Sequence, residues 1–235
     1  MDKQKTANKE NGFTESRKGN KFKFESPVPG LHIYSNIWPE SMDFMRELET
    51  DKFWEEHPLI GKPWIREDYF DEENGKKAST CWLWNHQKAA DALTEVIDSY
   101  LWHWDLDPQS REALRITKYT AGEFFSAHPD DSYGTPRTVS MVYYPNDDYE
   151  GGELEFLHFG VKIKPKAGQL FLFPSAYSYE HRIHPVTSGN ERYTIVSFFN
   201  HISEKEKSDR LKTIAFPYQA NLQYMFDKDF SVPKD

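Results

Sequence analysis

The hexapeptide Leu-Arg-Ile-Thr-Lys-Tyr at residues 114–119 marks a change in the periodicity of the chain. Before it, apolar residues recur at spacings of three and four; from here on they alternate with their neighbours, as in a β-strand. Short strands then follow in quick succession, separated by turns rich in Gly, Pro, Asn and Asp. We expect strands at 113–119, 123–128, 137–144, 153–157, 161–164, 169–173, 180–183 and 192–199. This series predicts a double-stranded β-helix, that is, a jelly-roll or cupin-like core, over residues 111–201.

Residues 25–110 precede this core and are expected to support it with helices and an edge strand. Leu31–Tyr34 has the pattern of a short strand, and a helix is expected from Pro39 onward. A second amphipathic helix is expected over 87–102, where apolar positions recur at helical spacing. The overall prediction is a mainly β fold with flanking helices.

The two ends of the chain have different compositions. Residues 1–24 are mostly polar, and we expect them to form a flexible tail. Residues 202–235 contain a charged stretch at 203–213, expected to be helical, and an aromatic tail expected to pack on the core.

The composition of the 235 residues excludes several classes of protein. The formal net charge is -9, which argues against nucleic acid or an anionic membrane as the main partner. A single cysteine, Cys81, excludes an intramolecular disulfide, and no apolar run is long enough to span a membrane. The N-terminus also lacks the apolar region of a secretory signal, so a cytoplasmic location is expected.

His128-Pro129-Asp130 is the first candidate for chemistry. In an extended chain, residues two apart point to the same face, so this imidazole and this carboxylate can bind one metal ion. The later segment 180–184 contains His181 and His184, either of which can supply a third ligand. Two histidines and one carboxylate leave coordination positions open, as in non-haem iron(II) oxygenases, although a zinc hydrolase fits the same three residues.

Arg192 favours the oxygenase over the hydrolase. It lies near the start of an aromatic, apolar strand, where burying a guanidinium is costly unless it meets an anion. Its planar fork suits a carboxylate. An iron site that uses the dicarboxylate 2-oxoglutarate needs such a cation, whereas a hydrolase does not.

A set of motifs in a fixed order carries a resemblance to a known family. The motifs are Tyr119-x-x-Gly122, His128-x-Asp130, Gly151-Gly152-Glu153, Pro165-x-x-Gly168 with Phe171 and Phe173, His181-x-Ile183-x-Pro185-Val186, and Gly189 with Arg192. Over roughly residues 111–201, this order resembles the prolyl 4-hydroxylase-like branch of the iron(II)/2-oxoglutarate dioxygenases.

The resemblance implies a role for each matched residue. His128, Asp130 and His181 would bind iron and form the catalytic centre. Arg192 would bind the distal carboxylate of 2-oxoglutarate. Two tyrosines, Tyr119 and Tyr144, match positions that hydrogen-bond this co-substrate, although a shift of register by one residue would turn Tyr143 inward instead of Tyr144.

The spacing of the distal histidine departs slightly from the family pattern. In relatives the basic residue lies somewhat closer to it, whereas Arg192 follows His181 by 11 residues and His184 by 8. We prefer His181, because the string His-Arg-Ile-His-Pro-Val places it at the family's ligand position and the extra residue fits the turn at 188–191.

The resemblance also implies a reaction and a class of substrate. It implies that iron(II), 2-oxoglutarate and O2, with ascorbate as an accessory reductant, hydroxylate an unactivated C–H bond and release succinate and CO2. A prolyl residue in a peptide or protein is the leading expectation, and a free amino acid or other small molecule is the alternative. A cupin-like module that binds metal without catalysis is the rival from another class, and it would not need Arg192.

Overall fold

A computed structural model describes residues 10–49, 65–67, 78–83, 87–132, 136–203 and 205–206. The largest sheet has ten strands, and its order is β1 (Glu10–Glu15), β2 (Lys21–Val28), β3 (Leu31–Tyr34), β13 (Gln169–Pro174), β9 (Arg137–Tyr144), β16 (Arg192–Asn200), β7 (Leu114–Tyr119), β5 (Ala78–Leu83) and β4 (Ile65–Glu67), with β6 (Ser110–Arg111) paired to β16. The second sheet has four strands in the order β12 (Val161–Ile163), β11 (Leu154–Phe156), β14 (His181–Ile183) and β8 (Phe125–His128). A third sheet pairs β10 (Tyr149–Gly151) with β15 (Val186–Gly189).

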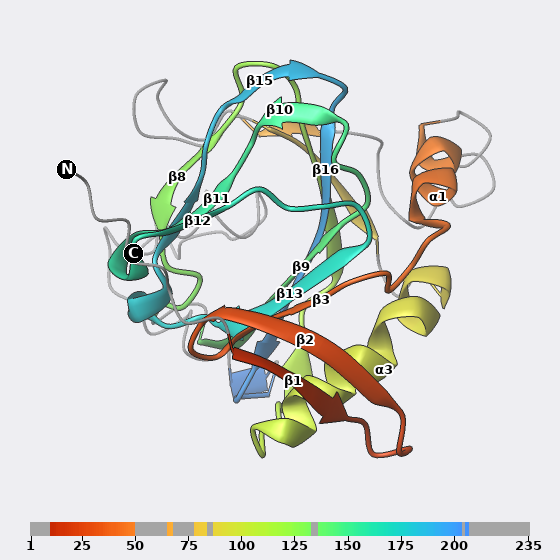
Figure 1. The fold of residues 1–235 in the computed structure, drawn as a ribbon, viewed down its shortest axis with the longest axis vertical. Coiled ribbons are helices and arrows are strands. Elements are labelled where there is room, and N and C mark those ends of the chain that lie inside the picture. The colour runs from red at the N-terminus through yellow and green to blue at the C-terminus, as the bar shows by residue number, and fades with distance from the viewer. Residues whose placement is uncertain are drawn as a thin grey trace, which may run out of the picture.

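These sheets form the expected jelly roll, with β8, β11 and β12 on one side and β9, β13 and β16 on the other (Figure 1). Helices α1 (Ser41–Leu48) and α3 (Gln87–His103) lie outside this barrel, against the large sheet. There are two short 3-10 helices in the described part of the chain: η1 (Leu157–Phe159) directly follows β11, and η2 (Tyr177–Tyr179) directly precedes β14. The prediction of a mainly β fold with flanking helices is confirmed.

Both faces of the large sheet are buried, as alternation along β13 makes clear. Leu170 and Leu172 belong to a core shared with side chains of α1 and α3. Phe171 and Phe173 point the other way and pack against side chains of β11 inside the barrel. Because successive strand residues face opposite sides, each central strand contributes to both cores, which explains its nearly continuous apolar sequence.

Residues 10–24 differ from the flexible tail expected from the sequence. They form β1 and the first half of β2, a hairpin paired along Glu10–Glu15, and the hairpin packs against α3. The hydroxyl of Thr14 lies 2.7 Å from that of Ser99 on α3 and 3.1 Å from that of Tyr34. The hairpin therefore docks partly through small polar side chains, which a pattern of hydrophobicity does not reveal.

Other differences are strands at positions where the sequence predicted none. The Gly-Gly segment at 151–152 and the turn at 187–190 contribute to β10 and β15, which pair with each other. Two further strands that were not expected, β4 and β5, lie at the edge of the large sheet. Most of the predicted C-terminal helix and tail lies outside the described residues. Within the part of the chain that is described, no helix is long and apolar enough to cross a membrane.

Candidate active site

Three side chains converge where the ends of two strands of the four-stranded sheet meet. His128 is the last residue of β8, and it pairs directly opposite His181, the first residue of β14. Asp130 lies in a bend just beyond β8, so it is the bend rather than an extended strand that brings it back. One ligand atom from each residue lies within 4.8 Å of the others. We call these three residues the metal cluster.

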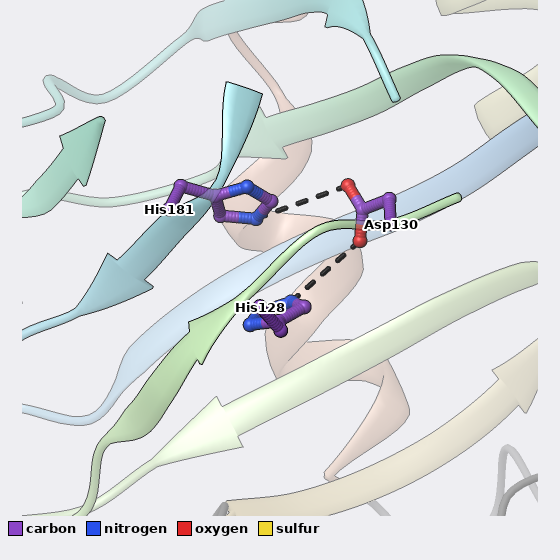
Figure 2. Close-up of side chains that lie close together, drawn as sticks. All are labelled: His128, Asp130 and His181. Atoms are coloured by element: carbon purple, nitrogen blue, oxygen red, sulfur yellow. Dashed lines mark ion pairs between the residues drawn. The ribbon is translucent and has the colours of Figure 1, made fainter. Parts of the chain in front are cut away.

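The carboxylate of Asp130 lies between the two imidazoles (Figure 2). Its Oδ1 is 3.6 Å from Nε2 of His128, and its Oδ2 is 3.8 Å from Nε2 of His181. On each ring the other nitrogen is already engaged: Nδ1 of His128 lies 2.8 Å from the Ser126 carbonyl oxygen, and Nδ1 of His181 lies 3.0 Å from that of Tyr179. These contacts assign the proton to Nδ1 and leave both Nε2 atoms available for a metal.

Asp130 is held by two further contacts, each supported by a neighbouring residue. The hydroxyl of Ser140 donates to Oδ2 at 2.6 Å, and the Ser175 hydroxyl lies 2.8 Å from that of Ser140. Arg137 donates to the backbone carbonyl of Asp130 at 3.3 Å, while a bidentate ion pair with Glu112 fixes the guanidinium. The carboxylate is therefore oriented before any metal binds.

Burial sets the charge state of the cluster. It lowers the pKa of His181 to about 4, against the opposing influence of Asp130, so the imidazole is neutral at pH 7, which is the form that binds metals. Burial also opposes ionisation of Asp130, but His181, His128 and Arg137 together hold the pKa of this carboxyl below its usual range. The cluster thus offers two imidazoles and one carboxylate.

His184 has a different environment from His181. Its Nε2 lies 2.6 Å from a carboxylate oxygen of Glu155, which also accepts hydrogen bonds from Arg182. His184 is not part of the metal cluster, so the geometry favours His181 as the third ligand.

Arg192 lies deeper in the same barrel. It is the first residue of β16, pairs with Tyr119 of β7 and is completely buried. Its Nε donates to the carbonyl of Gly152 at 3.0 Å, whereas Nη1 and Nη2 have no hydrogen-bond partner among the described residues. A buried guanidinium with an open fork is costly, so its geometry suits an anion that is not part of the chain.

Aromatic side chains surround this guanidinium. Its Cζ lies 5.1 Å from the ring centroid of Tyr119 and 5.2 Å from that of Tyr144. The buried hydroxyl of Tyr144 also has no partner in the described part of the chain. Tyr143 faces the opposite side, where its hydroxyl donates to the Trp38 carbonyl and lies 2.9 Å from the Ser41 hydroxyl. Of the two registers considered, the structure therefore has the one with Tyr144 inward.

One pocket extends from the metal cluster to the two tyrosines beside Arg192. Its lining includes the metal cluster together with Tyr119 and Tyr144, and its remaining walls are largely apolar, with side chains such as Val142 and Leu154. A ligand that reaches from the metal cluster toward Arg192 would thus lie in a largely apolar enclosure.

Comparison with known proteins identifies this arrangement. Residues 114–200 match the family described as the 2OG-Fe(II) oxygenase superfamily, and the matched range contains the metal cluster and Arg192.

The barrel that holds the site thus resembles the 2OG-Fe(II) oxygenase superfamily.

One relative of this chain is a PKHD-type hydroxylase of Idiomarina loihiensis, 25% identical over 151 residues, which are 60% of this chain and 66% of that protein. Across the matching PKHD-type hydroxylases the chain spans between 40% and 66% of their length.

Two solved structures share the fold of this chain. One is the viral collagen prolyl hydroxylase of Paramecium Bursaria Chlorella virus-1 in complex with 2OG, with a TM-score of 0.56 and 18% identity, covering 74% of this chain and 97% of that one. The other is a prolyl hydroxylase of Trichoplax adhaerens in complex with a peptide fragment of hypoxia inducible factor, with a TM-score of 0.55 and 19% identity, covering 76% and 86%.

The superfamily implies iron(II), 2-oxoglutarate and O2, and the residues of this site fit the first two. Two imidazoles and one carboxylate are a donor set for non-haem iron(II) that leaves positions open. The unpaired fork of Arg192 and the unpaired hydroxyl of Tyr144 are donors suited to a carboxylate.

Several residues around this site were not predicted from the sequence. Ser140 shares the inward face of β9 with Tyr144, and a small polar residue at such a position was a usable signal. Arg137 and Glu112 are far apart in the sequence and come together only in the fold. Tyr149 lies in an Asp-rich turn segment, where alternation gives no information about which way its ring points.

Proposed function

We propose that this chain is an iron(II)- and 2-oxoglutarate-dependent dioxygenase that hydroxylates a prolyl residue in a peptide or protein. The observation that supports this best is the pairing of the metal cluster with a buried, unpaired Arg192 fork in one barrel. A metal-binding module without catalysis has no use for such a costly cation.

In this proposal, His128, Asp130 and His181 hold the iron. Bound iron and 2-oxoglutarate together supply the oxidant that hydroxylates an unactivated C–H bond, with release of succinate and CO2. The contacts of both Nδ1 atoms with backbone carbonyls keep the rings facing the ion. Ser140 restrains one oxygen of Asp130, which leaves Oδ1 free of that hydrogen bond.

The arginine binds the co-substrate. The Nη1 and Nη2 atoms of Arg192 donate to the distal carboxylate of 2-oxoglutarate, and Tyr144 donates a further hydrogen bond. Tyr119 packs its ring over the guanidinium and lines the route to the metal cluster. The apolar walls exclude water, which strengthens each of these charge-assisted bonds.

The proposed class of substrate is based on the structural neighbours and on the net charge of the chain. One structural neighbour is a prolyl hydroxylase in complex with a peptide, and another is a collagen prolyl hydroxylase. The net charge of -9 suits a neutral or basic peptide better than an acidic one. We therefore propose a proline-containing peptide or protein as the substrate.

The experiment is a turnover assay with iron(II), 2-oxoglutarate, ascorbate and an array of proline-containing peptides. We expect succinate to form in proportion to peptides that gain one oxygen atom, and we expect Asp130→Ala to form neither product. Stimulation by free amino acids alone would move the substrate to the small-molecule class. Absence of succinate with well-folded, metal-loaded protein would favour the metal-binding module.

A further inference from the structure

A second tyrosine hydroxyl is buried without a partner beside Arg192. Tyr149, the first residue of β10, is 2% exposed, and its hydroxyl has no hydrogen-bond partner among the residues described. The same condition holds for the Tyr144 hydroxyl and for both Nη atoms of Arg192. Four buried donors thus lack acceptors in one region of the barrel.

Gly152 brings the Tyr149 ring and Arg192 together. A Cβ on this glycine would lie 2.7 Å from Cδ of Arg192 and 3.0 Å from Cε2 of Tyr149, so both side chains pack over the space that a side chain would fill. The backbone there has a φ of +64°, which glycine adopts readily and other residues rarely do. The local sequence therefore permits this close approach.

The ring of Tyr149 is fixed in place. Nζ of Lys164 lies 3.8 Å from its centroid and donates to the carbonyls of Tyr149 and Gly151, both at 2.6 Å. The ring also packs in a small cluster with Tyr119 and Val186. Tyr149 is therefore held beside Arg192, with a buried hydroxyl that makes no hydrogen bond to another described residue.

A carboxylate matches this set of donors in number and charge. Its two oxygens offer about four acceptor sites. Arg192 supplies two donors, and the two tyrosine hydroxyls supply one each. Burial raises the pKa of Tyr149 although the charge of Arg192 opposes the shift, so the phenol keeps its proton at neutral pH and can donate it.

We propose that Tyr149 is a further co-substrate-binding residue, whose hydroxyl donates to the distal carboxylate of 2-oxoglutarate beside Arg192 and Tyr144. This inference rests on the proposed function and adds to it a residue that none of the sequence motifs indicates. It also gives the site a means of selecting co-substrates, since a 2-oxo acid without a second carboxylate leaves all four donors unsatisfied.

The test compares Tyr149→Phe with Tyr143→Phe, which removes a buried hydroxyl on the opposite face of the sheet. Binding of 2-oxoglutarate and of 2-oxobutanoate, which lacks the distal carboxylate, is measured by anaerobic titration of the iron(II)-loaded protein. A hydrogen bond to a charged group predicts that Tyr149→Phe weakens 2-oxoglutarate about ten- to a hundredfold. Its affinity for 2-oxobutanoate and iron(II) should not change, and KM for 2-oxoglutarate should rise without a fall in kcat.

The controls separate binding from packing. Tyr149→Phe removes only an unpaired hydroxyl, so the ligand-free variant should melt no lower than the wild type. Tyr143→Phe loses two hydrogen bonds and should melt lower, yet bind 2-oxoglutarate normally. Equal affinity of Tyr149→Phe and wild type for 2-oxoglutarate would overturn this inference alone. A wild type that binds no 2-oxoglutarate would overturn the proposed function together with it.

Discussion

The metal cluster and the arginine pocket, which comprises Arg192, Tyr144 and Tyr149, lie in the same barrel but differ in how their polar atoms are satisfied. In the metal cluster, both imidazoles and the carboxylate have protein partners that orient them. In the arginine pocket, two guanidinium nitrogens and two hydroxyls have no acceptor among the described residues.

This difference separates two ways of preparing a site. The metal cluster is oriented in advance, so the cost of fixing its ligands is met during folding. The arginine pocket instead keeps buried donors unsatisfied. A ligand that accepts hydrogen bonds from them therefore adds interactions that the ligand-free fold lacks, and these favour binding. Removing a polar contact should therefore loosen the metal cluster, whereas removing an unpaired donor should leave the ligand-free arginine pocket at least as stable.

The largest effect should come from breaking the metal cluster. We expect His181→Ala to weaken iron(II) binding by at least about a hundredfold, because loss of a ligand costs more than loss of an outer partner. His184→Ala is the matched control, since His184 contacts Glu155 instead of the cluster. Titration of the metal-free proteins measures both affinities, and a larger loss in His184→Ala would reverse the assignment.

Arg192→Met should break the arginine pocket and leave the metal cluster intact. Loss of two charge-assisted hydrogen bonds predicts about a hundredfold weaker binding of 2-oxoglutarate or more, at about 1.5–3 kcal/mol for each bond. The ligand-free variant should be at least as stable as the wild type, because a buried cation with unpaired donors is removed. Calorimetry of 2-oxoglutarate binding tests the first expectation, and thermal unfolding of the ligand-free variant tests the second. Marked destabilisation of the ligand-free variant would show that Arg192 is a structural residue.

Ser140→Ala should sharpen the comparison by loosening the metal cluster without removing a ligand. The substitution deletes the 2.6 Å hydrogen bond to Asp130. Outer-sphere changes of this kind typically weaken metal binding about 10- to 100-fold, and we expect the lower end because Arg137 still holds the backbone of Asp130. Competition between the protein and a metal chelator measures the change. Unaltered iron(II) affinity would mean that Asp130 needs no orientation by Ser140.

The smallest effect on the site should come from His32, a buried imidazole far from either region. It stacks on Phe24 with ring centroids 3.7 Å apart, and burial, with a contribution from His103, lowers the pKa of His32 to about 4. Below about pH 6.5 the unfolded chain binds a proton at this position that the folded chain does not, so stability falls as pH drops from 6.5 toward 4.

His32→Leu should therefore reduce the loss of unfolding free energy between pH 7 and pH 5 by about 2 kcal/mol. Iron(II) and 2-oxoglutarate affinity at pH 7 should not change. Denaturant unfolding of the metal-free protein at the two pH values provides the measurement. An unchanged slope would mean that another group, such as His181, accounts for the whole loss.

The sequence predicted the barrel well because its strands are apolar enough to show alternation, as in β9 and β13. It predicted the metal cluster because the His-x-Asp motif and a later histidine are local patterns. It failed for the hairpin at residues 10–28, whose contact with α3 depends partly on Thr14 and Ser99. It also missed Ser140 and Tyr149, since their roles depend on which residues the folded strands place opposite them.

The central claim is that one barrel binds iron through the metal cluster and a dicarboxylate through Arg192. The most direct measurement is an anaerobic titration of metal-free protein with iron(II) and then 2-oxoglutarate, followed by visible absorption. We predict a weak charge-transfer band that appears only when both are present and saturates at one equivalent of each. Tight iron(II) binding with no band on addition of 2-oxoglutarate would contradict the account.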